Sequence, residues 1–61
     1  MNFLELKTIS VRKVFVNMNL VTMIEPMGDR VDDGCVIYFV SPDDILKVSN
    51  TYDDVKALMW R

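Results

Sequence analysis

The sequence predicts an α+β fold: a small antiparallel sheet or partly open barrel of four to five strands, followed by one C-terminal helix. Three observations lead to this prediction. Apolar and polar residues alternate through most of the chain, which is the period of a strand. Turn-forming residues separate these segments at short intervals. Only the last ten or so residues change to helical spacing. We expect one domain over residues 1–61.

The first two predicted strands, residues 2–9 and 12–17, are amphipathic, since their apolar residues alternate with polar or charged ones. The residues that we expect on their core-facing sides are Leu4, Leu6, Val14 and Val16. A turn should follow at residues 17–19, because asparagine tolerates left-handed backbone angles and its side chain closes local turns.

The next three segments are also predicted to be strands. Residues 20–25 form the third, and we expect Pro26 to end it because proline has no amide hydrogen to donate. Residues 35–40 are apolar on both faces, which predicts a central strand covered on each side by the helix or by another subunit. Residues 45–49 form the fifth strand, after a turn at residues 41–44.

A helix is predicted from about Tyr52 onward. Its apolar stripe consists of Tyr52, Val55, Leu58 and Met59. Thr51 stands three residues before Asp54, which resembles a capping box with aspartate in the Glu/Gln place. A helix of about ten residues is unstable alone in water, so we expect its stripe to dock on the sheet.

The composition raises the question of how so small a domain is stabilised. The chain has 61 residues, of which 51% are hydrophobic, with no histidine and one cysteine. A domain of about this length buries only about 60% of the surface that its unfolded chain exposes. One cysteine without histidine supplies neither an internal disulfide nor a zinc site. We therefore expect either oligomerisation or an unusually well-packed core.

The candidate chemistry of the chain favours a protein that is not an enzyme and holds no cofactor or metal. Cys35 opens an apolar strand and has no histidine to activate it, so we expect a buried, inert thiol. The serines lack a histidine too, which excludes a serine triad. Gly28 and Gly34 form no phosphate-binding loop. The acids of residues 27–34 are expected to belong to turns rather than to a metal site.

The apolar surplus predicts a binding surface. One helix can cover only one face of the sheet, so apolar residues out of phase with the core should form a second face. In the third strand this places Leu20 and Ile24 inward and Val21 and Met23 outward. The interface residues that we predict are Phe15, Met23, Tyr38 and Trp60. A small closed barrel with a few exposed outer residues is the alternative explanation of the same surplus.

The predicted function is that of a non-enzymatic protein-binding or structural module that self-associates through this apolar sheet face. Its partner would be a second copy, and another protein is the other candidate. The alternative is a small regulatory nucleic-acid-binding protein that uses strand-face aromatics to stack bases. Arg12 and Lys13 lie near Phe15, but the aromatics of the fourth strand have no basic neighbour. The net charge of −2 also disfavours phosphate contacts.

The apolar runs of the sequence and its N-terminus bear on the cellular location of the protein. The longest covers residues 35–40, far short of the ~20 residues needed to span a bilayer. The N-terminus lacks the basic region followed by an apolar stretch that is typical of a secretory signal. A lone cysteine fits a reducing compartment. We therefore expect a cytoplasmic protein with no membrane span.

Six short segments carry a resemblance to known proteins. They are Val14-Phe15-Val16-Asn17, Leu20-Val21, Ile24-Glu25-Pro26, Val36-Ile37-Tyr38-Phe39, Lys47-Val48-Ser49 and Tyr52-Asp53-Asp54-Val55. This layout resembles a group of small bacterial and phage proteins, distantly similar to the flagellar FlbD-like (swarming motility) proteins. The glycine usual before the second strand is replaced by Ser10 and Val11. The resemblance implies a strand meander closed by a helix, without enzymatic activity, acting through protein contacts.

Overall fold

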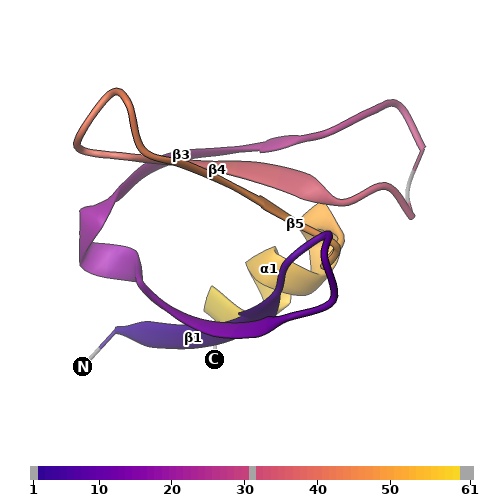
Figure 1. The fold of residues 1–61 in the computed structure, drawn as a ribbon. Helices are drawn as coiled ribbons and strands as arrows, with labels where there is room; N and C mark the ends of the chain where they lie inside the picture. Colours follow the sequence, from indigo (N-terminus) through magenta and orange to yellow (C-terminus); the bar gives the residue numbers. More distant parts are fainter. Residues whose placement is uncertain (1, 31, 60–61) are drawn as a thin grey trace.

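The computed structural model describes residues 2–30 and 32–59. It contains five strands in two antiparallel sheets, followed by one helix, which confirms the predicted α+β class (Figure 1). The elements are β1 (Phe3–Lys7), β2 (Lys13–Asn17), the 3₁₀ helix η1 (Met18–Leu20), β3 (Val21–Pro26), β4 (Cys35–Phe39), β5 (Ile45–Val48) and α1 (Tyr52–Met59).

The two sheets face each other as two layers. β1 pairs with β2, and β4 lies between β3 and β5, which confirms the predicted central strand. Ser49 N–H donates to the Lys7 carbonyl (2.7 Å) and Ile9 N–H to the Lys47 carbonyl (3.3 Å). The end of β1 is therefore hydrogen-bonded to the end of β5. The strands therefore follow the order β2-β1-β5-β4-β3 around the core. The arrangement is not a closed barrel, since no strand pairing joins β2 to β3 in the described part of the chain.

The core lies between the layers, where α1 closes one end (Figure 1). Its buried residues are Leu6, Val16, Cys35, Ile37, Val48 and Val55. Leu4 and Val14 pack against this cluster and are partly buried, so the predicted inward faces of the first two strands are confirmed. The helix docks through Val55 and, less completely, through Leu58. Tyr52 and Met59, the ends of its predicted stripe, remain exposed.

The third strand departs from the prediction. Its register shifts between Val21 and Met23, which inserts Thr22 as a β-bulge. A bulge adds one residue and so reverses which face the neighbouring residues occupy. Val21 consequently packs toward the core together with Ile24, and the prediction that it points outward is wrong. The prediction for Leu20 is also wrong, because this residue ends η1 and is half exposed.

Local polar contacts fix the ends of the elements as the sequence predicts. The Asn17 side chain accepts a hydrogen bond from Asn19 N–H (3.1 Å), which closes the turn that leads into η1. The Thr51 hydroxyl accepts one from Asp54 N–H (3.1 Å), which caps the first turn of α1. Both bonds satisfy backbone donors that have no partner within the short helix itself.

Gly34 allows β4 and β5 to approach closely. A Cβ atom at this position would overlap the Val48 carbonyl group, so no larger residue fits without moving the backbone of β5. Gly34 also accepts a hydrogen bond from Met27 N–H (2.8 Å), which extends the β3–β4 ladder by one pair. The start of the central strand is thereby held on both sides.

The turn between β1 and β2 contains a strained residue. Val11 has a φ of 66°, in the left-handed region that β-branched residues avoid. The turn is held by Val11 N–H to the Thr8 carbonyl (2.9 Å) and by Thr8 N–H to the Arg12 carbonyl (2.8 Å). Glycine adopts such angles without a steric cost.

Replacing Val11 by glycine is expected to stabilise the protein. The side chain is 73% exposed, so little packing is lost, while relief of the left-handed strain of about 1–2 kcal/mol outweighs the entropy cost of glycine, about 0.5–1 kcal/mol. We expect Val11→Gly to raise the free energy of unfolding by up to about 1 kcal/mol, measured by urea denaturation. Val11→Ala is the control, because it keeps a Cβ atom and with it the strain. A glycine variant less stable than the wild type would contradict the assignment.

Candidate functional site

The thiol and the acidic loop offer no reactive centre. The Cys35 side chain is fully buried, and its Sγ donates to the Asn50 carbonyl (3.4 Å). Burial raises the pKa of the Cys35 thiol, which disfavours the nucleophilic thiolate. In the acidic loop, the Asp33 carboxylate accepts a hydrogen bond from Arg30 N–H (3.2 Å), so it closes a turn. Among the described residues, no group of three or more His, Cys, Asp or Glu side chains could hold a metal ion.

The outer face of the three-stranded sheet is an apolar surface whose side chains are aligned in rows. We call it the sheet face. It carries two rows of residues in register across β3, β4 and β5. The first row is Met23, Tyr38 and Ile45; the second is Glu25, Val36 and Lys47. Because side chains alternate along a strand, all six point away from the core that Ile24, Ile37 and Leu46 face. Met23 and Ile45 are about half exposed, and α1 lies on the other side of the sheet.

A hydrogen bond orients the tyrosine at the centre of this face. The Tyr38 hydroxyl donates to Glu25 Oε1 (2.7 Å). The pKa of Tyr38 is raised, first by this hydrogen bond and then by partial burial and the nearby carboxylate charge, all of which favour the protonated phenol. The phenol therefore has its polar partner within its own sheet, and its ring can be covered without losing that bond.

The structure brings together two of the four predicted interface residues. Met23 and Tyr38 are directly paired across β3 and β4. Phe15 lies on the outer face of the other sheet, opposite Glu5, and its side chain is 72% exposed. Trp60 lies outside the described residues.

Ile45 completes the apolar row, although it is not among the predicted interface residues. A signal in the sequence exists, because Ile45 alternates with Leu46 and Val48, which face the core. The same criterion that selected Met23 and Tyr38 would have found it. Ile45 and Phe15 also both line a cavity of about 370 Å³ between β2 and the β4–β5 pair.

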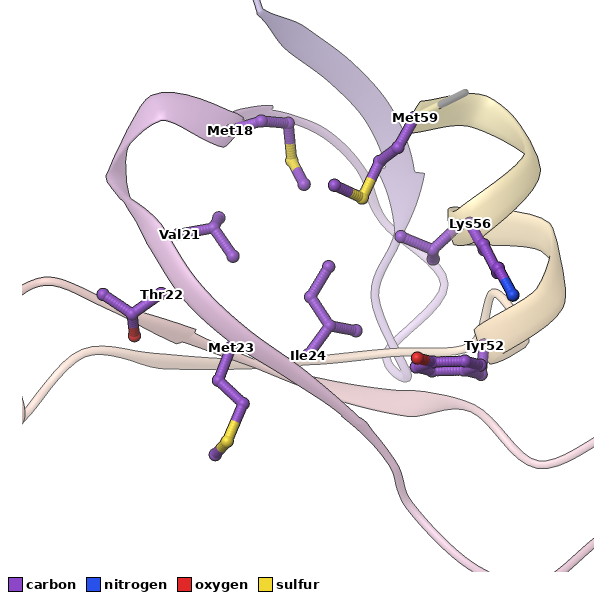
Figure 2. A pocket seen from close by; sticks show the side chains of 9 residues that line it. Met18, Val21, Thr22, Met23, Ile24, Tyr52, Lys56 and Met59 are labelled. Carbon is purple, nitrogen blue, oxygen red and sulfur yellow. The ribbon is translucent and has the colours of Figure 1, made fainter. Parts of the chain in front are cut away.

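A second apolar surface lies on the opposite side of β3. It is a cavity of about 340 Å³ between β3 and α1, which we call the β3–α1 groove. Val21 and Ile24 point into it, and the thioethers of Met18 and Met59 approach each other across it, whereas Met23 points away (Figure 2). The residues of α1 that line it are Tyr52, Val55, Lys56 and Met59.

The structure thus defines a small α+β domain with a largely apolar face, bordered by Glu25 and Lys47, on one side of β3 and an apolar groove on the other. Comparisons of the chain with protein-family models, with curated proteins and with solved structures find no significant match. Within the described residues, no helix is long and apolar enough to cross a membrane.

The burial of Cys35 predicts slow reaction with thiol reagents. The reagent reaches the Cys35 thiol only when the protein opens locally or unfolds. The raised pKa of this thiol also leaves little thiolate in the folded state. We expect the rate with a chromogenic disulfide at pH 8 to be about a hundredfold or more lower in native buffer than in denaturant. A core-destabilising Val55→Ala variant should react faster than the wild type. Equal rates in the folded and unfolded protein would show that the thiol is accessible.

Proposed function

We propose that this chain is a non-enzymatic protein-binding module that self-associates, with a second copy docked on the sheet face. The observation that supports the proposal is the in-register apolar row of Met23, Tyr38 and Ile45, bordered by Glu25 at one edge and Lys47 at the other. Single exposed apolar residues are ordinary on protein surfaces, but a continuous apolar row with charged residues beside it is typical of an interface.

The charges of this face make it complementary to itself. Consider two copies packed face to face about a two-fold axis that runs roughly along β4. β3 of one copy then lies over β5 of the other, and each row of one copy lies opposite the same row of the other. Glu25 of each copy faces Lys47 of the other, while Met23 faces Ile45 and Tyr38 faces Tyr38. Two ion pairs and an apolar centre form together, as an isologous interface requires.

The area of the face limits the strength of this association. Three strands about 4.8 Å apart and about five residues long cover roughly 250 Å² in projection. A standard interface buries about 800 Å² on each partner, so the face supports a reversible dimer rather than an obligate one. We expect a dissociation constant of roughly 10–100 μM. The Tyr38–Glu25 hydrogen bond reduces the cost of burying both groups.

Ile45→Asp should weaken the dimer strongly, because it would bury an unpaired charge in the apolar centre. Sedimentation velocity between 5 and about 500 μM protein would measure the association, with an expected weakening of at least about tenfold. Val11→Asp is the matched control. Val11 is also an exposed β-branched residue, 73% against 52% for Ile45, but it lies in the β1–β2 turn and its N–H bonds within that turn. A wild-type protein that stays monomeric throughout this range would overturn the proposal.

Charge reversal tests the geometry of the dimer. Glu25→Lys and Lys47→Glu should each weaken self-association, since each places like charges opposite one another. A mixture of the two variants should associate more tightly than either alone, by about tenfold at low salt, because both ion pairs reform in the mixed dimer. The measurement is sedimentation of the mixture against each variant at the same total concentration. A mixture that associates no more tightly than the two variants do separately would exclude this packing.

One observation favours a second candidate function, binding of single-stranded nucleic acid. The outer face of the β1–β2 sheet carries exposed Phe3 and Phe15, and Lys7 lies directly opposite Lys13. Bases can stack on such aromatics while lysines contact phosphates.

A salt titration decides this second candidate. With fluorescein-labelled oligouridine, we expect binding at about 20 mM salt to weaken by 200 mM with a shallow slope of about −1.4, corresponding to two phosphate contacts. Phe15→Ala should reduce the affinity, and Tyr38→Ala should leave it unchanged. Absence of binding at low salt would remove the candidate.

A further inference from the structure

The outer edge of β3 carries an unpaired backbone. Among the described residues, β3 pairs only with β4. Antiparallel residue pairs alternate between bonded and unbonded, and Met27–Gly34 is a bonded pair, with Met27 N–H donating to the Gly34 carbonyl at 2.8 Å. Counting back, Pro26 and Ile24 fall in unbonded pairs. This agrees with Pro26 lacking an amide hydrogen, and it directs the N–H and C=O of Ile24 away from β4.

The β3–α1 groove runs beside this free edge. Its lining includes Thr22 and Met23 as well as the inward-facing Val21 and Ile24, so it follows the strand edge and not only the inner face. Its volume of about 340 Å³ lies within the range of pockets that hold ligands. The side chains of Met18 and Met59 border it from either side (Figure 2), and flexible thioethers adapt to varied apolar partners.

We propose that the β3–α1 groove binds an extended segment of another polypeptide, which adds as a short strand to the edge of β3 next to α1. Its backbone would bond to the N–H and C=O of Ile24, and its alternate apolar side chains would enter the groove. An acidic residue would face Lys56, which lines the groove from α1 (Figure 2) and has no ion-pair partner among the described residues. This is strand addition, in which backbone bonds provide affinity and pockets provide specificity.

The neighbouring residues determine how long the added strand can be. The bulge at Thr22 interrupts the edge on one side, and Pro26 offers only a carbonyl on the other. The ligand segment therefore pairs over only about three or four residues, which limits its affinity to roughly the 100 μM range. The site is separate from the sheet face, because Met23 and Ile24 point to opposite sides of β3 (Figure 2).

Three acetylated octapeptides test the proposal. The first alternates valine with threonine and carries one central aspartate; the second has lysine in place of the aspartate; the third has an N-methylated central valine. We expect the first to bind best by fluorescence anisotropy, and the second to bind about two- to fivefold more weakly. The third should bind about tenfold more weakly than the first, because its methyl group blocks one backbone hydrogen bond. The amide resonance of Ile24 should shift most on titration.

Variants separate this proposal from self-association. Lys56→Glu should reverse the preference between the aspartate and lysine peptides. Met59→Asp should lower the affinity for both peptides by about tenfold. Ile45→Asp, which removes the proposed dimer interface, should bind the peptides as the wild type does. No binding of any peptide at 1 mM, an unchanged preference in Lys56→Glu, or amide shifts centred on Tyr38 and Ile45 would each overturn the proposal. None of these results depends on whether the wild type forms dimers.

Discussion

The contact on which the rest of the structure depends is the packing of Val55 between the two sheets. An eight-residue helix is not stable alone in water, and Val55 is the residue of α1 that is fully buried. In return, Val55 fills the space between the layers at one end and belongs to the same buried cluster as Leu6 of one sheet and Ile37 of the other. The helix and the two-layer arrangement therefore stabilise each other, and neither is expected to persist without the other.

This dependence also explains which surfaces stay open. A single helix of two turns can fill one end of the interior, but it cannot reach the outer face of either sheet. β3 is the strand most affected, since it lies at the edge of its sheet with α1 beside it and has an apolar side chain on each face. Ile24 contributes to the groove and Met23 to the sheet face, so one strand supplies both candidate surfaces.

The sequence predicts those elements whose local pattern and tertiary role agree. Leucine and valine alternation identifies β1, β2 and β5 and their inward faces, and Thr51 identifies the start of α1. The bulge at Thr22 leaves no such signal, because a β-bulge depends on the pairing with β4 and not on the residues inserted. Val11 is similar, since valine carries no turn propensity and is held at a positive φ by the hydrogen bonds of its turn.

Exposure alone does not distinguish a binding surface in a chain of this size. A domain of about 60 residues leaves much of its apolar surface in water whatever its fold. Ile9 and Val11, for example, are more exposed than Met23 or Ile45, but they lie in a turn and form no row. What separates the sheet face from such residues is the strand register, which aligns its apolar side chains and places opposite charges at its two edges. Composition predicts that apolar residues must remain outside; only the pairing of β3, β4 and β5 determines which of them form one continuous surface.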